Sequence, residues 1–305
     1  MGLGLIFPGQ GSQQVGMGSE FVAHHAAARQ LFEEANDALG FNLLKLCTEG
    51  PEDELTLTFN AQPAILTVGI MAHRLLADRA SLAPIAMAGH SLGEYTALVA
   101  ANAISFTDAV RTVHQRGKFM QEATPVGVGA MAAILGMEAE TLEQLCLEEA
   151  QGQVVAPANY NTPGQIVISG DTAAVERVLT RAKGKLLPVS APFHSSLMAP
   201  AAEKMGVVLA EVNFADATPP ICTNTDNRFL TEADHFAPNL VRQITSPVRW
   251  DTGVQAMAAE GVSQFVELGH GKVLAGMNKR IDKSLATLNV FDEATLGETL
   301  KSISA

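Results

Sequence analysis

Residues 84–101 have the sequence PIAMAGHSLGEYTALVAA, which is the most informative segment of the chain. It has the pattern of a short apolar strand, a tight turn and a helix, with Ser91 at the apex of the turn. Gly89 and Gly93 flank that apex, and glycine allows backbone angles and close approaches that a Cβ atom would block. Such an elbow lifts the serine oxygen clear of the sheet, beside the free N–H groups of a helix N-terminus that can stabilise an oxyanion. The stretch therefore predicts a nucleophilic serine; the alternative is a structural turn that happens to contain Gly, Ser and Gly.

Short apolar strands alternate with helical patterns along most of the chain. Buried strands separated by helices predict an α/β protein with a mostly parallel sheet that is covered on both faces. The expected strands are 3–7, 84–88, 219–223, 263–267 and 287–290, and the expected helices are 19–39, 62–77, 107–123, 197–212, 252–260 and 272–283.

The order of predicted strands and helices is different between residues 126 and 190. The expected order is strand 128–135, helix 138–150, strands 153–158 and 165–169 around a turn of Asn159, Asn161, Pro163 and Gly164, helix 172–182, and strand 185–189. This β-α-β-β-α-β order is the ferredoxin-like unit. We therefore predict a subdomain at 125–191, inserted into a core made of 1–124 and 192–305, with a ligand cleft between the two.

The composition of the chain limits the classes of function that it can have. The 305 residues are 47% hydrophobic and 17% charged, which is typical of a globular protein of about two domains. A net charge of −12 argues against non-specific nucleic-acid binding, which depends on neutralising phosphates. No segment approaches the ~18 apolar residues of a membrane span, and the N-terminus lacks the basic start of a signal peptide. Cys47, Cys146 and Cys222 are odd in number and widely spaced, so we expect no disulfide framework, no zinc site and a cytoplasmic location.

A serine nucleophile needs a neighbouring base, and an anionic substrate needs a cation. His194 follows the last expected strand of the insert, where a loop could hold an imidazole over the cleft, and His270 is its chief competitor. Arg116 is suited to fixing a carboxylate by a bidentate contact, although most helical arginines face solvent. The Gly-rich loop 7–13 follows the first strand and could present backbone N–H groups to an anion.

Two basic clusters could bind an anionic partner of this acidic chain. The first comprises Arg177, Arg181, Lys183 and Lys185, and the second comprises Lys279, Arg280 and Lys283. The alternative for each cluster is a solvated helix face.

These segments resemble the malonyl-CoA:acyl carrier protein transacylase family over nearly the whole chain. The resemblance is carried by FPGQGSQ at 7–13, GHSLGEY at 89–95, QRG at 115–117, NYNTPGQ at 159–165, FHS at 193–195 and QITSPVRW at 243–250. It implies a hydrolase-like core with a ferredoxin-like insert. It also implies transfer of malonyl from coenzyme A to the phosphopantetheine thiol of an acyl carrier protein in fatty acid synthesis, without a metal or redox cofactor.

The resemblance implies a role for each residue of the reaction centre. Ser91 would be acylated, and His194 would act first as general base and then as general acid. The backbone N–H groups of Gln10 and Leu92 would form the oxyanion hole. The main-chain carbonyl of Gln243 would orient His194, so that no triad carboxylate is needed.

The resemblance also implies the substrate contacts and leaves alternatives open. Arg116 would hold the free carboxylate of malonate, and Asn159 would line the cleft. Phe193 is similar to the malonyl-selective pattern of polyketide acyltransferases, and His270 stands where the family more often has proline. The alternatives are a discrete acyltransferase of a polyketide synthase, a serine hydrolase, and an interaction module without activity. Arg116 argues against the hydrolase, because simple esters carry no free carboxylate.

Overall fold

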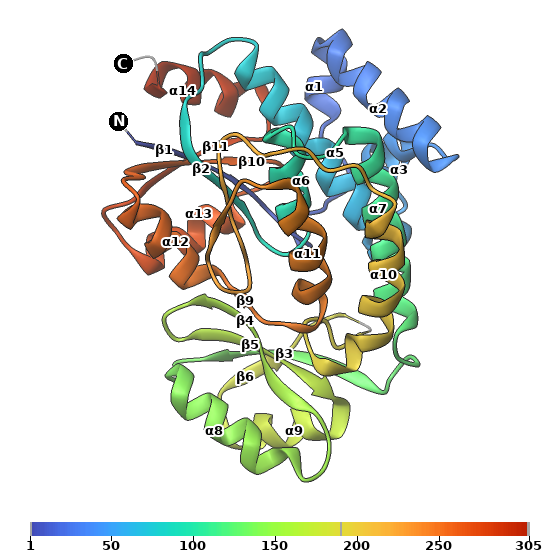
Figure 1. The fold of residues 1–305 in the computed structure, drawn as a ribbon, viewed down its shortest axis with the longest axis vertical. Helices are drawn as coiled ribbons and strands as arrows, with labels where there is room; N and C mark the ends of the chain where they lie inside the picture. The colour runs from blue at the N-terminus through green and yellow to red at the C-terminus, as the bar shows by residue number, and fades with distance from the viewer. Residues whose placement is uncertain (1, 190, 304–305) are drawn as a thin grey trace.

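The computed structural model describes residues 2–189 and 191–303, and it contains two β-sheets (Figure 1). The larger sheet has the strand order β11-β10-β1-β2-β7-β8, in which the first five strands are parallel and β8 is antiparallel to β7. Its strands are β1 (Leu3–Phe7), β2 (Pro84–Gly89), β7 (Ile221–Cys222), β8 (Phe229–Leu230), β10 (Gln264–Leu268) and β11 (Ala286–Val290).

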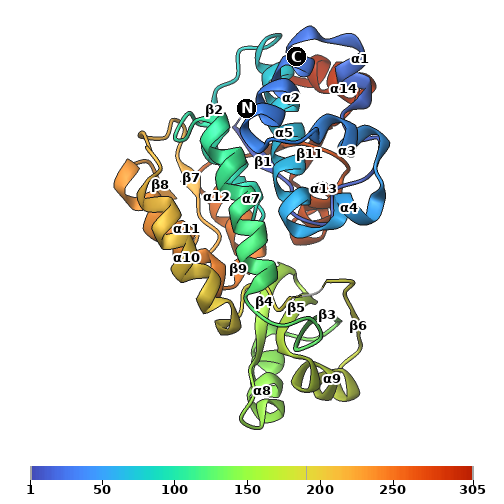
Figure 2. The same cartoon turned by 90° about the vertical axis from the view of Figure 1, so that its right-hand side faces the viewer.

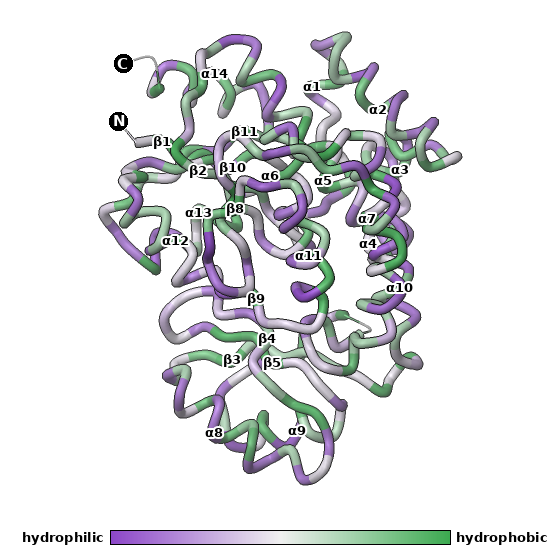
Figure 3. Tube along the Cα trace, in the orientation of Figure 1, coloured by the Kyte–Doolittle hydropathy of each residue, from purple (hydrophilic) through white to green (hydrophobic). Residues whose placement is uncertain are grey.

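Helices cover both faces of the larger sheet. Leu5 and Phe7 of β1 belong to one core with the helices α5 and α6, whereas Ile6 belongs to a second core with α12 and α13. Apolar colouring accordingly concentrates on the central strands, while polar segments recur on outer helices such as α2 (Figure 3). The helices are α1 (Ser19–His24), α2 (Ala26–Leu39), α3 (Leu43–Glu49), α4 (Glu52–Thr56), α5 (Thr58–Ala77), α6 (Gly93–Ala100), α7 (Phe106–Glu122), α10 (Ala199–Ala210), α11 (Phe236–Thr245), α12 (Trp250–Ala259), α13 (Val273–Ile281) and α14 (Glu293–Ile303).

The smaller sheet has the strand order β6-β3-β5-β4-β9. Its strands are β3 (Gly129–Leu135), β4 (Val155–Thr162), β5 (Gln165–Asp171), β6 (Gly184–Leu186) and β9 (Val248–Arg249), and its helices are α8 (Ala139–Ala150) and α9 (Thr172–Arg181). Figure 2 shows α8 and α9 at the end of the molecule that is remote from the larger sheet. Strand β9 arrives from the C-terminal half of the chain and pairs with β4 at Asn159 and Tyr160, so it ties the two sheets together.

The structure confirms a mixed α/β protein and the predicted strand 3–7, but it corrects two local predictions. The predicted single helix 19–39 is wrong, because the chain is extended at His25 (φ −124°, ψ 121°). The His25 ring bonds to Glu293 of α14, and this tertiary contact outweighs helix propensity. The predicted turn at Asn159 and Asn161 is also wrong. Both residues lie in β4, where pairing with β5 and β9 continues the strand to Thr162.

Several elements fall outside the predicted pattern. The sequence pattern predicts none of the helices α3, α4, α11 and α14 and neither of the two-residue strands β8 and β9. The last strand of the insert is shorter than predicted, since β6 ends at Leu186 and the residues 187–189 line a cleft instead. Among the described residues, no helix combines the length and the apolar character that a membrane crossing requires.

Candidate active site

The elbow holds Ser91 in a conformation that few non-glycine residues adopt. Its φ is +51°, and the neighbouring backbones approach so closely that only glycine fits at both flanks. A Cβ on Gly89 would lie 1.9 Å from the Gly93 carbonyl oxygen, and a Cβ on Gly93 would lie 2.1 Å from the Phe7 carbonyl oxygen. The Ser91 N–H donates to Oδ1 of Asn224 over 2.6 Å. This strained backbone is therefore fixed by contacts from β1 and from the turn after β7.

Ser91 and His194 form a hydrogen-bonded pair. The distance from Ser91 Oγ to His194 Nε2 is 2.8 Å, and His194 Nδ1 lies 3.0 Å from the carbonyl oxygen of Gln243. Since a carbonyl only accepts, Nδ1 carries the proton and Nε2 is free to accept from the serine hydroxyl. Burial lowers the pKa of His194 to about 3, the charge of Arg116 adds to the shift, and the Gln243 carbonyl opposes it. The imidazole is therefore a neutral base at physiological pH.

Arg116 of α7 is a buried cation, with 1% of its surface exposed. Its Nη2 donates to Ser91 Oγ (3.0 Å) and to Oε1 of Gln243 (2.9 Å), and its Nη1 donates to Oε1 of Gln62 (2.8 Å). The guanidinium also lies over the Tyr95 ring, 5.5 Å from its centroid. Within residues 2–189 and 191–303, no carboxylate forms an ion pair with Arg116. A buried guanidinium beside Ser91 suits a ligand carboxylate.

Ser91 opens onto a cleft of about 470 Å³, which is lined by the loops that follow β1 and β2 and by Met131 and Asn159 of the smaller sheet. The loop after β1 packs against the elbow, since a Cβ on Gly9 would lie 2.3 Å from the His90 carbonyl oxygen. Gln10 of this loop and Leu92 of the elbow both line the cleft, and no described residue accepts a hydrogen bond from either backbone N–H. Two backbone donors are thus available beside Ser91, where they could stabilise an oxyanion.

The other residues predicted for the site separate into two groups. Asn159 and Phe193 are buried and line the cleft. His270 does not line it, because its Nε2 lies 3.1 Å from Oε1 of Gln14 and its ring contacts Phe291. Among the predicted bases, the structure therefore brings His194 to Ser91, while His270 lies elsewhere.

The basic cluster of Arg177, Arg181, Lys183 and Lys185 is partly neutralised by neighbouring acidic residues. Arg181 pairs with Glu148 (2.9 Å) and Glu149 (2.7 Å), and Arg177 donates to the carbonyl oxygen of Glu149. Lys183 and Lys185 precede residues 187–189 of the cleft wall. These two lysines are therefore the better candidates for an anionic partner. The second cluster, at 279–283, does not line the cleft.

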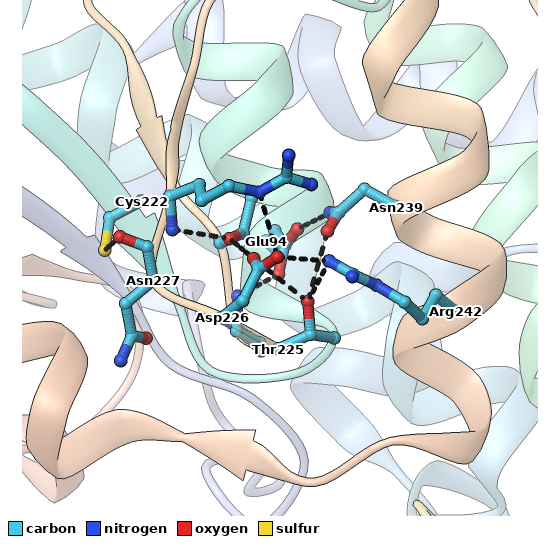
Figure 4. A network of polar contacts seen from close by, with 10 residues as sticks. Glu94, Cys222, Thr225, Asp226, Asn227, Asn239 and Arg242 are labelled. Atoms are coloured by element: carbon cyan, nitrogen blue, oxygen red, sulfur yellow. Dashed lines mark hydrogen bonds and ion pairs between the residues drawn. The ribbon is translucent and has the colours of Figure 1, made fainter.

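Glu94 also belongs to the site, although the sequence pattern did not predict a role for it. Its carboxylate accepts hydrogen bonds from the Asn224 N–H (3.0 Å), from Nε2 of Gln243 (2.9 Å) and from the Asn239 amide. Figure 4 shows Glu94 close to Asn239 on α11, and Thr225 in the turn after β7 is also bonded to Asn239. One signal was present in the sequence: Glu94 is the single charged residue of the otherwise uncharged segment 84–101. A charge in a buried helix needs a partner.

Comparison with known proteins agrees with this geometry. A family model described as the acyl transferase domain matches residues 5–301. The chain belongs to this family. The malonyl CoA-acyl carrier protein transacylase of Escherichia coli (strain K12) is 46% identical over 97% of this chain and 98% of its own. The crystal structure of an acyl carrier protein S-malonyltransferase from Vibrio cholerae superposes on this acyltransferase with a TM-score of 0.95, at 43% identity over 98% of this chain and 100% of that one.

A further solved relative is a malonyl-transacylase in complex with a type II PKS acyl-carrier protein. It has a TM-score of 0.96 and 43% identity over 99% of this acyltransferase and 100% of its own chain. Every residue discussed above for the site lies within the matched range 5–301.

Proposed function

We propose that this acyltransferase moves malonyl from coenzyme A to the phosphopantetheine thiol of an acyl carrier protein, through an ester on Ser91. One observation carries the proposal: Ser91 Oγ contacts both a neutral base, His194 Nε2 at 2.8 Å, and a buried cation, Arg116 Nη2 at 3.0 Å. The base activates the serine, and the cation selects an acyl group that carries a carboxylate. The names of the relatives support malonyl and the carrier protein as substrates.

In the acylation step, His194 takes the proton of Ser91 as the serine oxygen attacks the thioester carbonyl. The carbonyl oxygen becomes an oxyanion, which the N–H groups of Gln10 and Leu92 stabilise. When the carbon–sulfur bond breaks, the protonated His194 returns its proton to the leaving coenzyme A thiolate. The products are malonyl-Ser91 and free coenzyme A.

In the transfer step the same groups act in reverse. His194 takes the proton of the carrier thiol, the thiolate attacks the ester carbonyl, and the Ser91 oxygen leaves and regains a proton. The Gln243 carbonyl stabilises the imidazolium in both steps, since it accepts the Nδ1 proton at 3.0 Å. Acyl transfer changes no oxidation state, so the proposed reaction needs no redox cofactor, and the steps above are complete with the groups of Ser91, His194, Gln10 and Leu92.

We also propose the finer architecture that the sequence analysis predicts. A ferredoxin-like subdomain at 125–191 is inserted into a hydrolase-like core of 1–124 and 192–305. The order of β3, α8, β4, β5, α9 and β6 along the chain supports this description, as does their strand order β6-β3-β5-β4. The cleft then lies between core and insert, in a cytoplasmic enzyme of fatty acid synthesis.

Intact-mass analysis tests the chemistry. Brief mixing with malonyl-CoA should add one malonyl group to the wild type and none to Ser91→Ala. Ser195→Ala is the matched control, because the hydroxyl of this buried serine donates to the Pro192 carbonyl oxygen and does not line the cleft, so its loss should leave the adduct unchanged. An adduct on any residue other than Ser91 would refute the assignment.

The carrier is tested by adding holo carrier proteins to the malonyl-enzyme. A fatty acid carrier should discharge the adduct faster than a polyketide carrier does. The polyketide carrier is the alternative partner, because one solved relative is in complex with a type II PKS carrier. Discharge to water at the same rate without any carrier would favour a hydrolase.

A further inference from the structure

Two buried side chains of opposite charge lie near Ser91 without touching each other. Arg116 and Glu94 each have 1% of their surface exposed. In the part of the chain that the structure describes, neither forms an ion pair. A buried charge without compensation strongly destabilises a folded protein, so each of the two needs a partner.

The Gln243 side chain lies between the two charges and bonds to both. Its Oε1 accepts from Arg116 Nη2 over 2.9 Å, and its Nε2 donates to Glu94 Oε2 over 2.9 Å. The amide dipole therefore has its negative end at the cation and its positive end at the anion. That is the orientation in which one amide transmits the attraction between them.

The surroundings of Glu94 fit an ionised carboxylate. Its hydrogen-bond partners in the described part of the chain are N–H groups of Asn224, Asn239 and Gln243, and only an acceptor satisfies all of them. Burial raises the pKa of Glu94, while these donors and the charge of Arg116 lower it. Burial likewise lowers the pKa of Arg116, and the charge of Glu94 opposes that shift. Each charge thus favours the ionised form of the other.

We propose that Glu94 is the counter-charge of the substrate-carboxylate site: a positioning residue that acts on Arg116 through Gln243. A direct ion pair would occupy the guanidinium edge that a substrate carboxylate needs. With one amide between the charges, Arg116 stays compensated but still contacts Ser91 Oγ and lines the cleft. The charge pairing rests on geometry alone, and its consequence for malonyl rests on the proposed function.

The competing explanation is that Glu94 only braces the elbow. Its carboxylate holds the Asn224 N–H, and Oδ1 of Asn224 in turn accepts from the Ser91 N–H. A brace would stabilise the fold to the same extent whether or not Arg116 is charged. A counter-charge would matter only while the guanidinium is present. The two explanations therefore differ in the coupling between residues 94 and 116.

A double-mutant cycle in urea unfolding of the full chain measures that coupling. Glu94→Gln should reduce the folded-to-unfolded ratio at least about tenfold more in the wild type than in an Arg116→Met background, where no uncompensated cation remains. Additive effects, within about twofold, would overturn the proposal. If Glu94→Gln alone does not fold, a folded double variant is the expected result, and a double variant that also fails to fold overturns the proposal.

Glu267→Gln is the matched control. Glu267 is also buried and accepts from three N–H groups, in Leu274, Ala275 and Asn289. Because it has no contact with Arg116, its substitution should be additive with Arg116→Met.

Calorimetric binding of free malonate gives a second readout that a brace would not produce. Glu94→Gln should bind malonate several-fold more tightly than the wild type, because the ligand meets an uncompensated guanidinium that Gln62 still holds in place. Unchanged or weaker binding would overturn the proposal. If malonate binds to neither protein, the proposed function fails, while the unfolding cycle still decides the charge pairing.

Discussion

Replacing Arg116 by alanine tests the substrate assignment most directly. The guanidinium is buried, and no carboxylate in the described part of the chain pairs with it, so the malonyl carboxylate would be a direct anionic partner. A charge-assisted hydrogen bond contributes about 1.5–3 kcal/mol, and losing one partner of a buried charge pair costs about 3–5 kcal/mol. At about 1.4 kcal/mol for each factor of ten, Arg116→Ala should lower kcat/KM for malonyl-CoA by about two to three and a half orders of magnitude.

Acetyl transfer should respond in the opposite way. Acetyl has no carboxylate, so in the wild type its methyl group would face the guanidinium and leave that charge without an anionic partner. A site built for a charged group discriminates against such a substrate. Arg116→Ala removes that conflict, and acetyl transfer should stay equal or improve. The assay is single-turnover acylation with each acyl-CoA, followed by intact mass. Arg111→Ala is the control, since Arg111 lies exposed on the same helix α7. Equal weakening of malonyl and acetyl transfer would make Arg116 structural and refute the reasoning.

Three further predictions concern the base, the acyl pocket and the carrier. His194→Ala should slow acylation about 10²-fold or more, whereas His270→Ala should leave it unchanged. Because burial lowers the pKa of His194 to about 3, the imidazole stays in its base form as the pH falls. The rate of wild-type acylation should therefore stay constant from pH 8 to pH 5. A fall in that rate centred near the ordinary histidine pKa would contradict the buried geometry. Phe193→Ser should narrow the malonyl-to-methylmalonyl ratio of kcat/KM, since a pocket rejects a methyl group only by bulk, at about 1–3 kcal/mol. Charge reversal at Lys183 and Lys185 should raise KM for the carrier and weaken the dependence of KM on salt concentration. An unchanged salt dependence would mean that the two lysines do not contact the carrier.

The parts of the site that are predictable from sequence are those that local chemistry determines. The elbow at Ser91 depends on glycines within two residues of the nucleophile, and β1 is an uninterrupted apolar run. Each signal lies within a few residues of sequence, so it can be recognised without knowledge of the fold. The turn predicted at Asn159 failed for the converse reason. Asparagine favours turns, but pairing with Val248, which is 89 positions further along the chain, keeps Asn159 in a strand.

The polar network behind the nucleophile could not be predicted, because every bond in it joins distant segments. Glu94 meets Gln243 across 149 positions, and Arg116 meets Gln243 across 127. Helix α11, which carries Gln243, was itself not predicted. The position of Glu94, three residues after Ser91, does not indicate which hydrogen-bond donors will surround its carboxylate. Only the fold shows that this carboxylate does not line the cleft and that it contacts Gln243, which holds both His194 and Arg116.

Gln243 explains how the site works without a triad carboxylate. Its backbone carbonyl orients His194 while its side chain holds Arg116, so one residue at the end of α11 fixes both groups against Ser91 Oγ. A carboxylate in direct contact with His194 would raise the pKa of the imidazole and would also attract Arg116 away from its substrate. A neutral carbonyl does neither. The side-chain amide of Gln243 separates the negative charge of Glu94 from Arg116. His194 can therefore stay neutral, and Arg116 can stay available to a ligand, while both contact Ser91 Oγ.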